Sequence, residues 1–325
     1  MREEGKIKKE ELEELNRILK EADKINLGMA PEQQDIFNAF QAAKANLPSN
    51  KGFNRIGGYD KLIRLVKSQF IDGMIGFEKR FSANLNVVPN VVLFFGPTGV
   101  GKSTISQAVA EQTISNLEII KVGKQSPATV IKRLHEIGQE SKRAYENSGR
   151  DKKRTMVILD ETNEMQFSWT PEHFRQLNEF LQDCSSKHKC TVFLTTNHPL
   201  DLEPELLSED ITPLKIPVPP PTKDDIKAIL EKYFTLHRRP IFNFENVAQR
   251  FSSPQNGSYS NTDLVKICDA IFAVNTHVNE QTFIDLLDRR NIEKYNTTTL
   301  DELLRPKVTR TDIQDFEEAR RQLNV

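Results

Sequence analysis

The chain has 325 residues, with 45 Lys and Arg residues against 46 Asp and Glu residues, so its formal net charge is −1. This balance gives no overall field that would favour nucleic acid or an anionic membrane surface. Three cysteines in so long a chain predict reduced thiols rather than a disulfide framework. No apolar stretch reaches the length of a membrane span, and the charged start MREEGKIKKEE lacks a signal core. We therefore expect a soluble, cytoplasmic protein with no membrane partner.

The first fifty residues are predicted to form an N-terminal helical extension. Apolar residues recur at three- and four-residue spacing over 7–27, which predicts an amphipathic helix, and 31–47 has the features of a second helix. The segment PSNKG at 48–52 is typical of a linker. The first helix fits a short coiled coil, a partner-binding helix or a strut on the main domain, and the sequence leaves these three open.

From residue 51 the pattern alternates between apolar, strand-like runs and helical stretches, including one long helix over 128–147. Such alternation predicts a parallel β-sheet covered by helices on both faces, an α/β core that we place at 51–219. The expected strands are 91–95, 117–122, 156–159, 191–195 and 214–218.

The Pro-rich segment PVPPP at 217–221 ends this alternation. After it, every periodic segment has helical spacing, which predicts a small helical domain at 220–325. The expected helices are 225–233, 244–251, 262–273, 281–287 and 311–323.

A glycine-rich segment, GPTGVGKS, joins the apolar run 91–95 to a predicted helix. Backbone N–H groups in such a turn converge on phosphate oxygens, and the helix that follows presents the positive end of its dipole to the same anion. Lys102 is then expected to reach the β- and γ-phosphates, and the Ser103 hydroxyl to ligate Mg²⁺. The segment predicts binding of a nucleoside triphosphate by Gly96, Pro97, Thr98, Gly99, Val100, Gly101, Lys102, Ser103 and Thr104.

Two further strands end in polar side chains. The run MVILDE ends in Asp160 and Glu161, and because neighbouring side chains of a strand point to opposite faces, the two acids suit different tasks. Asp160 would hold Mg²⁺ through its water shell, and Glu161 would polarise the water that attacks the γ-phosphate. The run TVFLTTN ends in Asn197, whose amide suits a hydrogen bond to the γ-phosphate and the attacking water. The alternative is that Asn197 only caps the turn before Pro199.

These motifs together resemble the AAA+ ATPases, and specifically the AAA family proper. GPTGVGKS resembles its Walker A loop, MVILDE its Walker B strand, TTNHP at 195–199 its sensor 1 and LEPELL at 202–207 its "LDPALL". Ile56-Gly57-Gly58 is similar to the segment that this family places near the adenine ring, and NTDL at 261–264 resembles the "GADL" that opens a lid helix. The helix at 312–323 resembles the last lid helix.

The resemblance covers 53–325 and implies a three-layer P-loop NTPase core whose helical lid closes over ATP and Mg²⁺. It also implies adenine contacts from Ile56 and Gly57, and usually a hexameric ring.

The sequence departs from the family pattern at three places. Two arginines normally follow "LDPALL" and reach into the neighbouring subunit's site, but here Ser208–Ile211 contains no arginine, so another cation or partner would supply the charge, or hydrolysis would be slow. Between Val122 and Met156 the aromatic-hydrophobic-Gly loop of polypeptide-threading members is replaced by EIG at 136–138 inside the long helix. Asn261 replaces the glycine of "GADL", which affects the detail of adenine contact.

We therefore expect Mg²⁺-dependent ATP hydrolysis coupled to remodelling of a protein partner. The alternative is an ATP-dependent switch or loader with weak intrinsic hydrolysis, which could act on nucleic acid through the basic run RDKKR at 150–154. That run fits a nucleic-acid contact, a source of cations at a subunit interface or a solvated surface, of which the solvated surface is favoured.

Two smaller clusters have simpler interpretations. Cys184, His188 and Cys190 lack a fourth ligand and CxxC spacing, which favours ordinary surface thiols over a metal site. Phe167 and Trp169 form a short aromatic pair that favours packing.

Overall fold

The computed structural model describes residues 51–71, 89–113, 115–147, 154–252, 258–274, 278–287 and 307–325. The chain divides into two compact units, Met1–Asn46 and Leu47–Val325, and all described residues belong to the second. The two predicted N-terminal helices and residues 150–153 of the basic run lie outside the described residues. The domain boundaries at 50 and 219 stay predictions.

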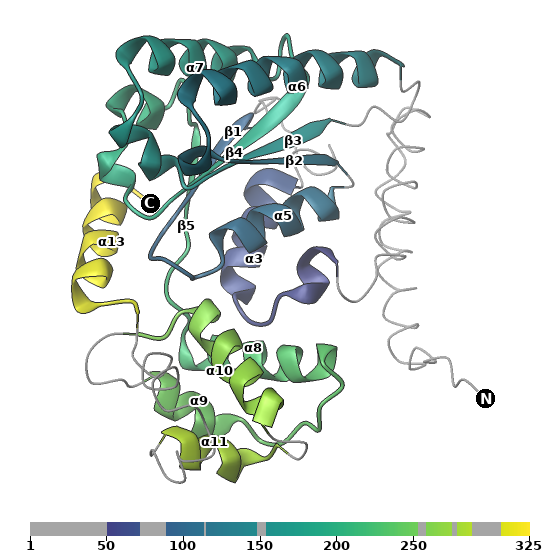
Figure 1. Ribbon diagram of the computed structural model, residues 1–325, viewed down its shortest axis with the longest axis vertical. Helices are drawn as coiled ribbons and strands as arrows, with labels where there is room; N and C mark the ends of the chain where they lie inside the picture. Colours follow the sequence, from purple (N-terminus) through teal and green to yellow (C-terminus); the bar gives the residue numbers. More distant parts are fainter. Residues whose placement is uncertain are drawn as a thin grey trace, which may run out of the picture. The chain divides into compact units, whose positions relative to one another are not determined.

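The centre of the second unit is a five-stranded parallel sheet with strand order β2-β3-β4-β1-β5 (Figure 1). Its strands are β1 (Val91–Phe95), β2 (Asn116–Lys121), β3 (Thr155–Asp160), β4 (Cys190–Thr196) and β5 (Leu214–Pro217). Each agrees with a predicted strand to within two residues at either end. All residues of β1, β3 and β4 are buried, which explains why these runs are apolar on both faces rather than alternating.

Helices cover both faces of the sheet. Alternate β1 residues separate the two layers: Val92 and Phe94 pack with α3 (Asp60–Val66) and α5 (Lys102–Gln112), while Val91, Leu93 and Phe95 pack with α6 (Pro127–Asn147) and α7 (Pro171–Asp183). Figure 1 shows α6 and α7 on one side of the sheet and α3 and α5 on the other. The three-layer α/β core and the long helix α6 are thereby confirmed.

The helical segments after β5 have a hydrophobic core of their own. It is formed by α8 (Lys223–Leu236), α9 (Glu245–Ser252), α10 (Asn261–Val274) and α11 (Glu280–Leu287), with Phe234 and Phe244 fully buried at its centre. We call these four helices the lid. The last helix, α13 (Arg310–Gln322), instead contributes Phe316 and Ala319 to the core on the α6 and α7 side of the sheet.

Short helical turns connect these elements. They are η2 (Gly52–Arg55), η3 (Lys67–Ile71), η4 (Val122–Lys124), η5 (Thr162–Phe167), η6 (Pro199–Asp201) and η7 (Pro204–Leu207). None of the helices in the described part of the chain combines the length and apolar character that a membrane crossing requires.

Two predictions about individual side chains need correction. Cys184 and Cys190 are not surface thiols: both are fully buried, because they lie where α7 ends and β4 begins, beneath the layer that covers the sheet. Of the aromatic pair, Trp169 packs in the core as predicted, but Phe167 at the end of η5 is 74% exposed.

Candidate active site

The sheet brings the sequence-predicted site residues to one edge. The glycine-rich segment follows β1, Asp160 and Glu161 lie at the end of β3, and Asn197 follows β4. Because β4 pairs with both β1 and β3 in parallel, these three carboxyl ends are neighbours. The structure thus gathers segments that lie about 60 and 100 residues apart along the chain.

We call Gly96–Ser103 the phosphate loop. Gly99 and Gly101 have φ angles of +78° and +97°, a left-handed region that favours glycine, and Gly101 is the residue before α5. A Cβ on Gly96 would lie 2.1 Å from the carbonyl oxygen of Val218, which no side chain could tolerate. Val100 is fully buried and anchors the loop in the core. The loop is therefore a fixed strand-to-helix turn that ends at a helix N-terminus.

Lys102 lies inside this loop. Its ammonium group donates to the carbonyl oxygens of Gly96 and Pro97, both at 2.8 Å, and to Oδ1 of Asn197 at 2.6 Å, which uses all three of its donors. The residue is only 7% exposed. Burial lowers the pKa of Lys102 to about 7, and the carboxylates of Asp160 and Glu161 oppose part of that shift.

Ser103 and Asp160 are hydrogen-bonded to each other. The Ser103 hydroxyl donates to Oδ1 of Asp160 at 2.6 Å, and the buried Thr195 hydroxyl donates to the same oxygen at 2.6 Å. A hydroxyl and a carboxylate in contact are hard oxygen ligands of the kind that Mg²⁺ prefers.

Glu161 lies beyond the end of β3 and does not continue the strand's alternation of side chains between the two faces of the sheet. Its φ and ψ angles are +63° and +47°, it immediately precedes η5, and its backbone N–H donates to Oγ1 of Thr195 at 3.1 Å. Asp160 is buried and Glu161 is exposed. The two acids therefore have different environments, as expected, but a left-handed turn rather than strand alternation separates them.

Asn197 lies between the phosphate loop and η5. Its side-chain oxygen accepts from Lys102, and its backbone N–H donates to Oδ1 of Asn163 at 3.4 Å. The Asn163 amide in turn donates to Glu164 at 3.1 Å. Asn197 is thus part of a polar network, which goes beyond the capping of a turn.

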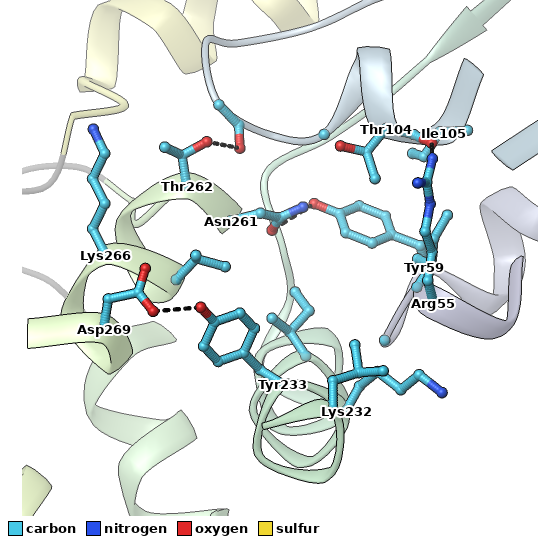
Figure 2. Close-up of a pocket in the computed structure, with 17 residues that line it drawn as sticks. Arg55, Tyr59, Thr104, Ile105, Lys232, Tyr233, Asn261, Thr262, Lys266 and Asp269 are labelled. Atoms are coloured by element: carbon cyan, nitrogen blue, oxygen red, sulfur yellow. Dashed lines mark hydrogen bonds between the residues drawn. The ribbon is translucent and has the colours of Figure 1, made fainter. Parts of the chain in front are cut away.

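A pocket of about 460 Å³ adjoins the phosphate loop (Figure 2). Ile56, Gly57 and Tyr59 line it from one side, and α8 and α10 of the lid from the other. A Cβ on Gly57 would lie 2.3 Å from the Ala228 carbonyl oxygen, so this segment packs directly against the α8 backbone. The pocket is also lined by Arg55, Gly99, Gly101, Thr104, Ile105, Ile229, Lys232, Tyr233, Leu236, Asn261, Thr262, Val265, Lys266 and Asp269.

The lid wall of the pocket contains a hydrogen-bonded pair of polar side chains, Tyr233 and Asp269. The Tyr233 hydroxyl donates to Oδ1 of Asp269 at 2.5 Å, and Figure 2 shows the two side chains pointing toward each other from α8 and α10. Burial, with Asp269 as a second cause, raises the pKa of Tyr233 above its usual value. The hydroxyl therefore stays a neutral donor that ties the two lid helices together.

Sequence reasoning missed Thr195, Asn163 and Tyr59. The first two are buried polar residues that support Asp160 and Asn197. Thr195 lies inside the segment TTNHP and Asn163 lies two residues after MVILDE, but neither motif indicates these contacts. Tyr59 directly follows Ile56-Gly57-Gly58 and has a left-handed φ of +59°, which is rare for an aromatic residue.

The geometry agrees with the comparison to known proteins. Residues 92–219 match the model of the "ATPase family associated with various cellular activities (AAA)". These residues belong to the AAA family of ATPases. The AAA match begins at the second residue of β1 and includes β3 and β4, with all the polar residues at the carboxyl ends of these three strands.

Relatives extend the similarity beyond the AAA domain. The chain is 25% identical over 248 residues to the proteasome-activating nucleotidase of Methanothermobacter thermautotrophicus, covering 73% of this chain and 58% of that protein. It is 24% identical over 275 residues to 26S proteasome regulatory subunit 10B of Dictyostelium discoideum, covering 79% and 66%. Protein SAV of Sulfolobus acidocaldarius is 24% identical over 220 residues, covering 65% and 27%. The matched region thus spans between about a quarter and two thirds of each relative.

The departures from the AAA pattern are also visible in the structure. Ser208–Ile211 follows η7 and has Glu209 and Asp210 exposed, with no cation within the segment. EIG at 136–138 lies inside α6 and is not a loop: Ile137 and Gly138 are buried, and a Cβ on Gly138 would meet the His188 ring at 2.6 Å, while Glu136 is exposed.

Proposed function

We propose that this chain binds ATP with Mg²⁺ between the phosphate loop and the lid and hydrolyses it. The observation that carries this proposal is the convergence of Lys102, Asp160, Glu161 and Asn197 on a glycine turn that opens beside the 460 Å³ pocket. In this proposal the phosphates lie against the N-terminus of α5, and the base and ribose lie against Ile56 and Gly57.

The donor set fits a magnesium ion. Ser103 and Asp160 would hold it, directly and through water, because their oxygens lie 2.6 Å apart and are hard ligands. When bound, Mg²⁺ neutralises charge that develops on the phosphate oxygens. Thr195 fixes the orientation of the Asp160 carboxylate from behind.

The chain's own residues would divide the remaining chemistry. Glu161 is exposed at the strand end and is assigned the task of orienting and deprotonating the attacking water. Lys102 would exchange its contacts with loop carbonyls for contacts with phosphate oxygens, which are stronger acceptors. Asn197, which already touches Lys102, is assigned to the γ-phosphate and the water.

The proposal for the partner rests on the relatives. Two of them are named a proteasome-activating nucleotidase and a 26S proteasome regulatory subunit, so we propose that nucleotide-driven lid movement remodels a protein partner, within a homo-oligomeric ring. A hexamer is the ring expected from the family resemblance. Remodelling without threading is favoured, since 136–138 is inside a helix.

A second function is favoured by one observation. Ser208–Ile211 contains no arginine, and an arginine finger typically contributes about 10³- to 10⁵-fold to turnover. The chain would then be a switch that binds ATP and hydrolyses it slowly until a partner supplies a cation. Action of this switch on nucleic acid is less favoured, because Arg154 of the basic run donates instead to Asn90, just before β1, and to Ser185, just after α7.

The experiment that tests the proposal compares three proteins. Wild type, Lys102→Ala and Glu161→Gln are assayed for binding of a fluorescent ATP analogue with Mg²⁺ and for phosphate release. We expect Lys102→Ala to lose binding, and Glu161→Gln to bind like wild type while losing turnover. Glu179→Gln is the matched control, because Glu179 is an exposed acid on α7 that pairs with Arg175, outside the network of Asn163 and Asn197. Undiminished hydrolysis by Glu161→Gln would overturn the assignment of that residue.

A further inference from the structure

Asn261, the first residue of α10, joins three segments that are distant in sequence, and Figure 2 shows its amide beside the Tyr59 hydroxyl. Its amide nitrogen donates to the carbonyl oxygen of Val100 in the phosphate loop at 2.7 Å. Its amide oxygen accepts from the Tyr59 hydroxyl at 3.2 Å. Because one end of the amide needs an acceptor and the other a donor, the two partners together fix its orientation. The residue that replaces the family's lid glycine is therefore a bridge between lid, phosphate loop and the segment after Ile56-Gly57-Gly58.

The next residue of the lid binds the loop as well. The backbone N–H of Thr262 donates to the carbonyl oxygen of Gly99 at 3.2 Å, and its hydroxyl donates to the same oxygen at 3.3 Å. Thr262 thereby uses one of the N–H groups that every helix leaves free at its start. Two successive lid residues thus bind two successive carbonyls of the phosphate loop.

These contacts set the direction of the loop's N–H groups. In a planar trans peptide the C=O and N–H groups point in opposite directions. With the carbonyls of Gly99 and Val100 held toward the lid, the N–H groups of Val100 and Gly101 must point away from it, into the turn. N–H groups with that orientation are what a phosphate requires.

The lid approaches the loop too closely for larger residues. A Cβ on Gly99 would lie 2.6 Å from the Ser260 hydroxyl, and one on Gly101 would lie 3.1 Å from the Asn261 amide nitrogen. Ser260 is itself fixed, because its backbone N–H and hydroxyl both donate to Asp263, at 2.9 and 2.8 Å, and both residues are buried. The start of α10 is therefore a rigid platform for Asn261.

Tyr59, the other partner of the Asn261 side chain, is also fixed by hydrogen bonds. Its backbone N–H donates to Asp225 near the start of α8 at 2.5 Å, and its hydroxyl also lies 3.2 Å from the carbonyl oxygen of Pro219, which precedes the lid. Burial raises the pKa of Tyr59 far above its usual value, so the hydroxyl remains a neutral donor. Tyr59 thus joins the segment after Ile56 to the residues around the start of the lid, through Pro219 and Asp225, and to the start of α10, through Asn261.

We propose that Asn261 is a positioning residue that keeps the phosphate loop in its binding-competent form and transmits nucleotide occupancy to the lid. This inference rests on the proposed ATP binding and adds a residue and a route of coupling to it. Loss of the bridge should weaken nucleotide binding and loosen the lid, while the chemistry at Glu161 stays unchanged.

The first measurement is the affinity for the slowly hydrolysed analogue ATPγS with Mg²⁺. We expect Asn261→Ala and Tyr59→Phe each to weaken binding by about threefold to tenfold, the effect of one or two hydrogen bonds. The double variant should lose less ATPγS affinity than the product of the two single fold-changes, because both substitutions remove the same hydrogen bond between Tyr59 and Asn261. Asn246→Ala is the matched control: Asn246 is a lid asparagine that bonds Glu280 at 2.6 Å, in α9, which does not line the pocket.

The second measurement separates positioning from a general loss of structure. Spin labels at Lys132→Cys on α6 and Gln281→Cys on α11 report the distance between core and lid, and the three native cysteines are buried. ATPγS should narrow the distance distribution in wild type and Asn246→Ala but much less in Asn261→Ala. Turnover by Asn261→Ala should show a raised KM with kcat changed by less than about twofold.

The outcomes distinguish the inference from the proposed function. Wild-type binding of ATPγS by Asn261→Ala, with the same narrowing of the distance distribution between the spin labels, would overturn the proposed role of Asn261 and leave the proposal of ATP binding intact. If Asn261→Ala does not fold, Tyr59→Phe answers the same question, since it removes the donor to the Asn261 amide oxygen and adds no charge. If wild type itself fails to bind ATPγS, both the proposed function and this inference are overturned.

Discussion

The ammonium group of Lys102 lies 2.6 Å from Oδ1 of Asn197. This hydrogen bond joins the phosphate loop after β1 to the polar residue after β4, so each side chain restricts the conformation of the other. It predicts that Asn197→Ala lowers kcat by roughly ten- to a hundredfold, somewhat less than the loss of one preorganised donor typically costs. The affinity for ATPγS should change by less than about threefold, because the backbone of the loop is untouched. Steady-state turnover and equilibrium binding measured on the same preparation check this, and equal losses in both would indicate that Asn197 only supports the fold.

Thr195 should hold both the Asp160 carboxylate and the backbone of Glu161 in place. Its hydroxyl donates to Asp160 and accepts from the Glu161 N–H, so Thr195→Val leaves the Glu161 N–H without its acceptor and removes one of the two hydroxyls that donate to Asp160. We expect a loss of about 1–3 kcal/mol in the free energy of unfolding and a higher Mg²⁺ requirement for turnover. Urea unfolding and a Mg²⁺ titration measure the two effects.

Thr191 provides the matched control for that substitution. It is fully buried on the same strand, and its hydroxyl has no hydrogen-bond partner in the structure. Thr191→Val should therefore be neutral or stabilising, with an unchanged Mg²⁺ requirement. Equal destabilisation by both variants would show that the Thr195 contacts add nothing beyond burial.

Gly57→Ala should close part of the pocket. The added Cβ would lie 2.3 Å from the Ala228 carbonyl oxygen and 2.7 Å from Cα of Ile229, and both are backbone atoms of α8 that cannot rotate away. We expect the segment to be displaced, with at least tenfold weaker ATP binding and a lower melting temperature. In Gly123→Ala the new atom meets only the Glu164 side chain, which can move, so its binding should stay within about twofold of wild type. Nucleotide titrations of the two variants make the comparison.

The sequence alone predicted the features that depend on short, continuous segments. Five strand-like runs and the Pro-rich break specify the sheet and the start of the lid. The signal is continuously apolar for β1, β3 and β4, because these strands are buried on both faces of the parallel sheet. The phosphate loop and the ends of β3 and β4 were likewise visible, since each is a short segment with its own chemistry.

Contacts between distant segments could not be predicted in this way. Asn261 binds Val100 and Tyr59, which are 161 and 202 residues away, and nothing in the segment NTDL indicates either partner. Glu161 leaves the strand because its backbone is left-handed immediately before η5, a conformation that the run MVILDE does not indicate. Burial of Cys184 and Cys190 was missed for a similar reason: the sequence shows their polar neighbours and not the layer above them.

His188 should make stability depend on pH. Its ring stacks on Phe180 with centroids 4.7 Å apart, and burial, with His135 as a second cause, lowers the pKa of His188 below its usual value; Asp183 opposes the shift, while Lys187 and Lys142 add to it. The folded state therefore binds this proton more weakly than the unfolded state, so the stabilisation is present above about pH 6.5 and is lost as the pH falls through the lower folded-state pKa. Melting temperatures between pH 7.5 and 5 should fall less steeply in His188→Gln than in wild type. His198→Gln, at an exposed position, should keep the wild-type slope.

The missing arginine predicts how the rate depends on protein concentration. If the subunits of a ring complete one another's sites, a cation elsewhere in this chain replaces the finger, and the ATPase rate per subunit should rise cooperatively as the protein is concentrated. Sedimentation over the same range would then show assembly at the concentrations where the rate rises, with Glu161→Gln as the blank for background hydrolysis. A flat, slow rate despite tight ATP binding would contradict this and favour the switch, because Glu209 and Asp210 in the finger segment can only repel a neighbour's γ-phosphate. In that case adding partner proteins, rather than more of the same chain, is what should raise the rate.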